Sequence, residues 1–353
     1  MRLESIGFYS LSDERAATAS ATSPLQRCEL ILTGNCNFSC PYCRRVGGPN
    51  LSFDDALNTV RLWAKDRLRC IRFSGGEPTM WPRLEELVTY AHHCGMEWIA
   101  VSSNGSMGRH VYDRLIEAGV NDFSISLDAC CAEDGDKMAG GVKGAWAKVI
   151  SNIEYLSTRV YTTVGVVLTP ENAAEIGGTI DLAESLGVSD IRVIPAAQCS
   201  RHLMGVPSRV WPGRFPILQY RMNNVRNGRS VRGIGPRDSH RCGLALDDMA
   251  VMGTQHYPCI IHMREGGAPI GQVGANMRAE REQWYKTHDT HSDPICQANC
   301  LDVCRQYNNV FERTNPVAKI AFSINTTEAI FATETRTEGA SNPRAATTSL
   351  RVL

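Results

Sequence analysis

The stretch that decides the fold is TGNCNFSCPYC, residues 33–43, in which Cys36, Cys40 and Cys43 follow a C-x3-C-x2-C spacing. A loop this tight can place three thiolates around one face of an iron–sulfur cluster, because thiolates are soft ligands that suit such clusters or zinc. Three protein ligands leave one iron free to bind a substrate or cofactor. The apolar run at 29–33 predicts a buried strand, which puts the loop at a strand's carboxyl end, where α/β barrels build their active sites.

This loop resembles the C-x3-C-x-aromatic-C loop of the radical S-adenosylmethionine (SAM) superfamily, with Tyr42 as its aromatic residue. The resemblance implies a [4Fe–4S] cluster coordinated by Cys36, Cys40, Cys43 and SAM. It also implies that reduction cleaves SAM to methionine and a 5′-deoxyadenosyl radical, and that Tyr42 belongs to the cofactor site. The alternatives for the same residues are a structural zinc loop or cysteines that fill a core.

Composition and charge favour an ordinary globular chain. Its 353 residues are 43% hydrophobic and 21% charged, and the formal net charge of zero does not favour nucleic acid or a membrane as a partner. The first residues lack the apolar core of a signal peptide, and no run of 18 apolar residues occurs, so we expect a cytoplasmic protein. In that compartment, 14 cysteines indicate metal sites rather than disulfides.

Strand-like and helix-like segments alternate through the first part of the chain. The predicted strands are 29–33, 70–74, 98–102, 123–127, 163–168 and 191–194. Amphipathic helical patterns separate them, and this alternation predicts an α/β fold with a parallel sheet and right-handed crossovers. Six units are too few for a closed eight-stranded barrel, but they match the partial (β/α)6 TIM-like barrel of the radical SAM family.

The predicted organisation has five parts. They are an N-terminal lead-in at 1–27, whose residues 10–26 are expected to be mobile, the radical SAM (β/α)6 core at 28–200, an arginine-rich link at 201–241, a small auxiliary-cluster domain at 242–313, and a C-terminal tail at 314–353. The tail loses periodicity and is rich in Thr, Ser, Ala, Gly and Asn, so we expect part of it to be disordered.

The sequence SGGEP, residues 74–78, follows the second predicted strand. Gly75 and Gly76 allow the backbone to approach a ligand closely, and Glu77 can accept a hydrogen bond from an ammonium group. In the radical SAM family this element contacts the amino group of SAM, so Gly75, Gly76 and Glu77 are predicted cofactor-binding residues. The alternative is a plain glycine turn that starts a helix.

Short polar side chains end two further strands. Ser102 and Asn104 end the third strand, and Ser126 and Asp128 end the fourth, where alternation places Ser126 and Asp128 on one face. By resemblance to the family they bind the SAM ribose, its carboxylate or the substrate, and the sixth-strand backbone at Ile194 contacts adenine. We assign Asp128 a catalytic role; the alternative for each residue is a strand-ending turn.

The adjacent pair Cys130 and Cys131 lies just past the fourth strand. A thiol there could donate a hydrogen atom to a product radical, so Cys131 is a second catalytic candidate; the alternative is an incidental pair in a loop. Three more cysteines lie in or near apolar runs and are expected in the core, whereas the role of Cys199 is undetermined. Those three are Cys28, Cys70 and Cys94.

A second group of cysteines lies in the last third of the chain. It comprises Cys242, Cys259, Cys296, Cys300 and Cys304. The first two flank a glycine as C-x10-G-x5-C, which resembles the opening hairpin of twitch and SPASM domains. The resemblance implies one auxiliary [4Fe–4S] cluster held by the first two and by two of the last three, with the spare one undetermined. The alternative is a zinc site made from the same ligands.

The segment 201–241 contains nine arginines and a single acid, Asp238, which gives a local excess of +8. Arginine forms bidentate, charge-assisted bonds to carboxylate and phosphate. We therefore predict an anionic substrate, and the candidate contacts are Arg221, Arg226, Arg229 and Arg232. The alternative is a solvated surface loop.

The predicted function is that of a radical SAM enzyme which abstracts a hydrogen atom from a polar, anionic small molecule, such as a sugar acid or a nucleotide. A reducing partner such as flavodoxin or ferredoxin is expected. Three alternatives stay open: a maturase of ribosomal peptides or protein side chains, an enzyme that modifies a base in nucleic acid, which is not favoured, and a non-catalytic iron–sulfur redox protein. The sequence does not name the substrate or the fate of its radical.

Overall fold

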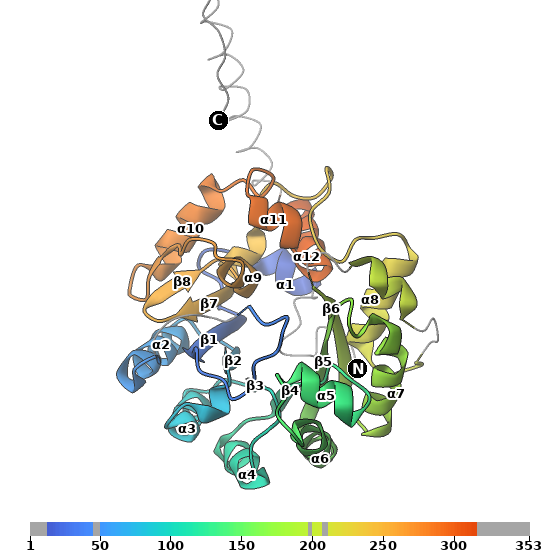
Figure 1. Cartoon of the computed structure of the whole chain (residues 1–353). Coiled ribbons are helices and arrows are strands. Elements are labelled where there is room, and N and C mark those ends of the chain that lie inside the picture. The colour runs from blue at the N-terminus through green and yellow to red at the C-terminus, as the bar shows by residue number, and fades with distance from the viewer. Residues whose placement is uncertain (1–12, 45–49, 197–199, 207–210, 316–353) are drawn as a thin grey trace, which may run out of the picture.

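The computed structural model describes residues 13–44, 50–196, 200–206 and 211–315. One sheet of nine strands runs through this part of the chain in the order β6-β5-β4-β3-β2-β1-β7-β8-β9 (Figure 1). The strands are β1 (Arg27–Thr33), β2 (Cys70–Gly75), β3 (Trp98–Ser103), β4 (Asp122–Ser126), β5 (Tyr161–Leu168), β6 (Asp190–Pro195), β7 (Asp248–Met252), β8 (Gln255–Tyr257) and β9 (Gly271–Gln272). Strands β1 to β6 pair in parallel, which confirms the predicted α/β class with a partial (β/α)6 TIM-like barrel.

Helices cover the outer face of the parallel strands (Figure 1). They are α2 (Phe53–Lys65), α3 (Leu84–His93), α4 (Arg109–Ala118), α6 (Ala145–Ser157) and α7 (Ile176–Ser185). The short helix α5 (Ala132–Met138) follows β4 and packs against α6 at the carboxyl ends of the strands. In α2, for example, Ala56, Val60 and Trp63 are fully buried in the core, and Ser52 caps the helix by accepting the Asp55 N–H at 3.1 Å. Burial of one large apolar side chain contributes about 1.5–3 kcal/mol, so packing against the sheet stabilises these helices more than propensity does.

The cysteine-rich region extends the same sheet. β7 pairs in parallel with β1, and β8 and β9 add antiparallel strands at that edge. The helices after β6 are α8 (Pro216–Arg226), α9 (Ile260–Arg264), α10 (Met277–Thr287), α11 (Pro294–Asn299) and α12 (Asp302–Thr314). No helix in the described ranges has the length and apolar character that crossing a membrane requires.

The lead-in that the sequence predicts to be mobile contains helix α1 (Asp13–Thr18), so that prediction is wrong for these residues. The helix packs against α12. Arg15 Nε donates to Asp247 Oδ2 at 3.0 Å, and the Tyr307 hydroxyl donates to the same oxygen at 2.9 Å. These contacts attach the start of the chain to the cysteine-rich region. Most of the predicted C-terminal tail, residues 316–353, lies outside the described residues.

Two arginines of the arginine-rich link support the fold. Arg221, on α8, is almost fully buried, and its guanidinium donates to Val193 O at 2.9 Å and to Asp302 Oδ1 at 2.7 Å. Arg232 Nε donates to Pro195 O at 2.8 Å. Arg221 therefore joins β6 to α12, and the substrate-binding role predicted for it is wrong because its charge is already satisfied inside the protein.

Replacing Arg221 with Met should lower the free energy of unfolding by about 3–5 kcal/mol, because Asp302 is then a buried charge without its partner. The measurement is urea unfolding of the anaerobically purified protein. Arg229→Gln, an exposed position of the same segment, is the control and should change stability by less than about 0.5 kcal/mol. Equal unfolding midpoints for Arg221→Met and the wild type would contradict the structural role of this pair.

Candidate active site

A cavity of about 240 Å³ lies at the carboxyl ends of the parallel strands. Cys36, Cys40 and Cys43 all line it, so the loop that follows β1 forms part of its wall. Eight further residues predicted from the sequence also line it, namely Tyr42, Gly75, Gly76, Ser102, Asn104, Ser126, Asp128 and Ile194. The structure thus gathers around one cavity the ends of β2, β3, β4 and β6 and the cysteine loop.

The turn after β2 packs directly on the start of the cysteine loop. Gly76 N donates to Thr33 O at 2.7 Å, and Glu77 N donates to Asn35 O at 2.8 Å. A Cβ at Gly75 would lie 2.4 Å from Thr33 O, and a Cβ at Gly76 would lie 2.2 Å from Asn35 O. Glycine is therefore required at both positions for close packing between two backbones, in addition to any approach to a ligand.

Glu77 does not line the cavity, contrary to its predicted contact with the cofactor. It is fully buried, with Oε1 accepting from Ser103 Oγ at 2.9 Å and Oε2 accepting from the Asn104 backbone N–H at 2.6 Å. Oε1 also accepts the Thr79 N–H at 3.1 Å. Both carboxylate oxygens are used within the protein, so Glu77 positions the ends of β2 and β3.

Asn104 connects the end of β3 to the cysteine loop. Its Nδ2 donates to Asn37 Oδ1 at 2.8 Å and lies 3.7 Å from Cys36 Sγ. Asn37 Nδ2 in turn donates to Ser106 Oγ at 2.9 Å. Hydrogen bonds to a ligating sulfur tune an iron–sulfur cluster, so Asn104 is well placed for that role as well as for cofactor contact.

Asp128 holds the other end of the loop. The Tyr42 hydroxyl donates to Asp128 Oδ2, and the Val167 backbone N–H donates to Oδ1 at 2.7 Å. Burial raises the pKa of Asp128 to about 6, which the two donors partly oppose. Burial and the Asp128 carboxyl raise the pKa of the Cys40 thiol to about 11, so bound iron would be needed to make it a thiolate at neutral pH.

The hydrogen-donor role predicted for Cys131 is not supported by its position. Cys131 is exposed at the start of α5, where its thiol contacts Asp134 at 3.1 Å, and it does not line the cavity. Its neighbour Cys130 faces α7, because a Cβ at Gly178 would lie 3.1 Å from the Cys130 sulfur. Cys28 and Cys70 are buried, as predicted, and Cys199 lies outside the described residues.

Two arginines that the sequence analysis did not single out line the cavity, whereas Arg221, Arg226, Arg229 and Arg232 do not. Arg192, on β6, donates through Nη2 to Ser124 Oγ at 3.1 Å on β4, and its Nε is buried without a hydrogen-bond partner in the described part of the chain. Burial lowers the pKa of Arg192 to about 10, so it remains cationic at neutral pH.

The second arginine, Arg264, ends α9 and lies 3.7 Å from Glu29 on β1. A Cβ added at Gly165 on β5 would lie 3.6 Å from Arg192 Nη2, an ordinary van der Waals contact, so this arginine lies over β5. The signal for Arg192 was present in the sequence, because a charged residue interrupts the apolar strand 191–194. Arg264 carried no such signal.

The five cysteines of the last third line a second, smaller and mostly apolar cavity of about 40 Å³. Cys259 caps α9 and accepts the His262 N–H at 3.4 Å, and Asn308 Nδ2 lies 3.5 Å from Cys242 Sγ. Burial raises the pKa of Cys242 to about 11. Because Cys259 is the N-cap of α9 and Arg264 is its last residue, one short helix connects the walls of the two cavities.

The spacing of the cysteine sulfur atoms can be compared with that of an occupied zinc site. In the described ranges, no three cysteine sulfurs lie within 4.8 Å of one another. Four ligands around one zinc at about 2.3 Å would bring sulfur atoms to roughly 3.8 Å apart. Neither cysteine group therefore has three sulfurs at the spacing that one zinc ion imposes, among the residues that the structure describes.

Comparison with protein families and curated proteins gives one consistent result. Residues 30–183 match the model of the Radical SAM superfamily. A "Probable GTP 3′,8-cyclase" of Saccharolobus solfataricus is 30% identical over 177 residues, which are 48% of this chain and 57% of that relative. An "AdoMet-dependent heme synthase" of Methanosarcina barkeri is 28% identical over 162 residues, 44% of this chain and 46% of the relative. The chain thus spans about half the length of the curated relatives it matches.

Solved structures share the fold over more of the chain. A structure of anSMEcpe with bound AdoMet matches 85% of this chain and 99% of its own, with a TM-score of 0.57 and 14% identity. Streptococcus suis SuiB bound to the precursor peptide SuiA matches 80% of this chain and 67% of its own, with a TM-score of 0.53 and 13% identity. At these identities the likeness concerns the fold alone.

The close packing at Gly76 predicts a specific metal-binding defect. Gly76→Ala should lower the iron content by up to about four atoms per chain, the content of one [4Fe–4S] cluster, because the added Cβ displaces the cysteine loop. The measurement is iron per chain, with electron paramagnetic resonance, after anaerobic reconstitution. Gly205→Ala is the control, since a Cβ there meets no atom within 4 Å. Wild-type iron content in Gly76→Ala would rule out this turn as the element that positions the loop.

Proposed function

Because residues 30–183 of this chain form a radical SAM domain, we propose that the protein is an enzyme that reductively cleaves SAM and abstracts a hydrogen atom from an anionic small molecule. One observation carries the proposal: the three cysteines of the C-x3-C-x2-C loop and the carboxyl ends of the parallel strands line the same cavity. A protein that only stores or senses electrons has no need for a cavity beside its cysteines.

The residues present suit the cofactors that this chemistry needs. Cys36, Cys40 and Cys43 would hold a [4Fe–4S] cluster and leave one iron for SAM. Ser102, Asn104, Ser126, Gly75 and Ile194 line the same cavity as these cysteines, and their polar side chains and backbone groups would bind SAM. Bound there, the cluster and SAM would supply the radical chemistry after one-electron reduction.

The protein's own contribution is positioning. Asp128 holds Tyr42, and with it the cysteine loop, while Glu77 fixes the end of β3 that carries Asn104. Loop and strand ends are therefore held by buried hydrogen bonds rather than by exposed contacts. Such preorganisation keeps the reacting atoms in a fixed geometry, and this is the main way in which a protein assists radical chemistry carried by a cofactor.

We infer the substrate class from Arg192 and Arg264. A buried guanidinium with an unpaired N–H group is costly unless it binds an anion, and arginine matches carboxylate and phosphate with two parallel bonds. Arg192 is such a group at the cavity wall, and Arg264 adds a second cation at its rim. The similarity to proteins named as GTP 3′,8-cyclases supports a nucleotide as one member of this class.

An auxiliary [4Fe–4S] cluster at the second cavity is part of the proposal. Five cysteines around one apolar space exceed the four that such a cluster takes. The reaction also needs a one-electron donor, and a small reducing protein of the flavodoxin or ferredoxin type would supply it.

The first test removes the three thiols of the cysteine loop. Changing Cys36, Cys40 and Cys43 together to Ala should remove about four irons per chain and abolish formation of 5′-deoxyadenosine after reduction with dithionite. Cys131→Ala, outside the cavity, is the matched control and should retain both. If the triple variant still formed 5′-deoxyadenosine, this loop would not be the SAM site.

The second test concerns the substrate. Candidate anions, GTP among them, are incubated with the reduced protein, and substrate-dependent 5′-deoxyadenosine is measured. With the substrate so found, Arg192→Met should raise KM about 10- to 100-fold, the cost of one lost charge-assisted hydrogen bond. Arg229→Gln should leave KM unchanged.

Ionic strength separates the remaining alternatives. One anion bound in a closed cavity should show a shallow dependence of KM on salt, whereas contacts to many phosphates of a nucleic acid would make affinity fall steeply. A steep dependence of KM on salt would favour a nucleic acid as the substrate. Turnover of an uncharged peptide that Arg192→Met does not affect would favour a peptide. Either result would contradict an anionic small molecule as the substrate.

A further inference from the structure

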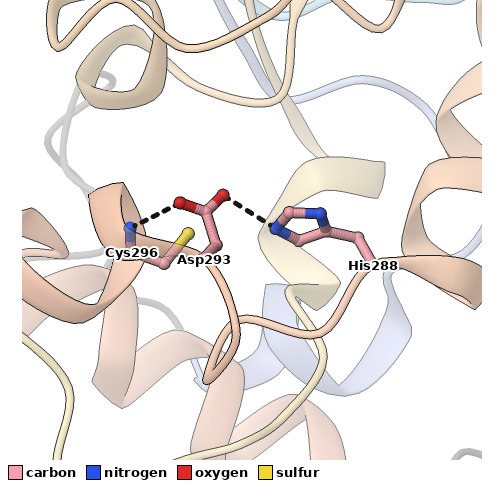
Figure 2. A group of neighbouring side chains, drawn as sticks. All are labelled: His288, Asp293 and Cys296. Carbon is pink, nitrogen blue, oxygen red and sulfur yellow. Dashed lines mark hydrogen bonds and ion pairs between the residues drawn. The ribbon is translucent and has the colours of Figure 1, made fainter. Parts of the chain in front are cut away.

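Three side chains with metal-ligating atoms meet beside the auxiliary cysteines, away from the cavity that the parallel strands form. A ring nitrogen of His288, a carboxylate oxygen of Asp293 and Cys296 Sγ all lie within 4.8 Å of one another, and Figure 2 shows the three side chains. Within the described ranges, this is the one set of three His, Cys, Asp or Glu side chains that lie so close together. The sequence analysis noted only Cys296.

Two helix ends bring these residues together. His288 directly follows α10, Asp293 is the N-cap of α11, and Cys296 lies in the first turn of α11. Asp293 Oδ1 accepts the Ile295 N–H at 2.7 Å and the Cys296 N–H at 3.2 Å. Capping therefore uses one carboxylate oxygen and leaves Oδ2 to face the histidine (Figure 2).

The geometry of His288 suits a metal ligand better than a hydrogen-bond donor. Its Nε2 lies 3.0 Å from Asp293 Oδ2, yet this contact does not have hydrogen-bond geometry, and Nε2 is buried without another partner among the described residues. Two ligands of one zinc ion at about 2.0–2.2 Å lie roughly 3.3 Å apart, close to this separation.

Neighbouring side chains hold the ligands in place. The Trp284 indole stacks on the His288 ring, with 4.1 Å between the ring centroids and 17° between the planes. His262 Nε2 lies 3.0 Å from Asp293 Oδ2 and forms a hydrogen bond with it. Hydrogen bonds from outside the ligand set commonly orient a ligating carboxylate, and His262 fits that position.

We propose that His288, Asp293 and Cys296 bind one zinc ion. A set of one nitrogen, one oxygen and one thiolate suits zinc, which accepts all three ligand types in tetrahedral sites, with water in the fourth position. The ion joins the end of α10 to α11 and fixes the wall of the second cavity that Cys296 lines.

The assignment also identifies the spare cysteine of the auxiliary group. With Cys296 on zinc, Cys242, Cys259, Cys300 and Cys304 remain, which is the number of ligands that one [4Fe–4S] cluster takes. This second part rests on the proposed auxiliary cluster, whereas the zinc site does not.

The first experiment measures metals on the full-length protein, reconstituted anaerobically with iron and sulfide in the presence of zinc. We expect about one zinc per chain, with one sulfur ligand at about 2.3 Å and the others nitrogen or oxygen at about 2.0–2.2 Å by zinc K-edge X-ray absorption. Iron does not interfere, because the edge is specific to zinc. Absence of zinc, or a shell of three or more sulfurs, would overturn the proposal.

The second experiment separates the two metals by substitution. His288→Gln, Asp293→Asn and Cys296→Ala should each lose the zinc and keep the iron content at about eight per chain, while Cys304→Ala should lose about four irons and keep the zinc. His240→Gln, at a histidine that lies 2.9 Å from Asp289 in the adjoining turn, should keep both.

The iron of the cysteine loop after β1 reports on folding in every variant, so a misfolded protein is recognised by loss of that signal as well. Loss of about four irons in Cys296→Ala would assign Cys296 to the cluster and refute the zinc site. A wild type with only four irons but one zinc in a one-sulfur shell would support the zinc site and reject the auxiliary cluster.

Discussion

The cavity depends on one buried charge, the carboxylate of Glu77. A charge without solvent costs several kcal/mol unless hydrogen bonds satisfy it, and burial accordingly raises the pKa of Glu77. Its donors come from the Thr79 N–H just after it and from Ser103 and Asn104 at the end of β3. The need to satisfy this carboxylate therefore aligns the ends of two strands, and the glycines before it place the same turn against the loop that carries the cysteines.

The interior of the barrel is polar where a TIM-like barrel is usually packed with branched apolar residues. Arg72 on β2 lies 3.9 Å from Asp122 on β4, and Arg192 on β6 donates a hydrogen bond to Ser124 on β4. Burial lowers the pKa of Arg72 and raises that of Asp122, and each charge partly opposes the shift of the other. Of these groups, Arg192 and Ser124 line the cavity, so one cation is held at its wall.

Much of the fold could be predicted because short stretches of sequence determine its individual strands. Strands buried on both faces read as continuous apolar runs, and all six predicted strands begin and end within two residues of the observed bounds. The cysteine loop is equally local. Glu77 and Cys131 show the limit of prediction from the sequence. Their positions place both residues near the cavity, but the sequence does not determine the direction in which each side chain points.

Long-range contacts explain the remaining predictions from the sequence that the structure contradicts. A high local charge marks the arginine-rich link, yet charge counts do not reveal that Arg221 finds Asp302 inside the protein, whereas Arg229 remains exposed. The two arginines that do line the cavity, Arg192 and Arg264, lie outside that link. The pairing of β7 with β1 also has no local signature, because parallel register depends on strands far apart in the sequence.

That pairing has a consequence for how the chain is made. Arg27 on β1 and Asp248 on β7 form an ion pair across the sheet although they are 221 residues apart. At about 5–20 residues per second, a ribosome needs roughly 10–45 s to synthesise the chain between them. During this interval β1 can pair with β2 but has an open edge on its other side, and open edges recruit other chains. The nascent protein is therefore most prone to aggregation before its last third has emerged. In this interval a chaperone that covers the open edge of β1 would reduce aggregation most.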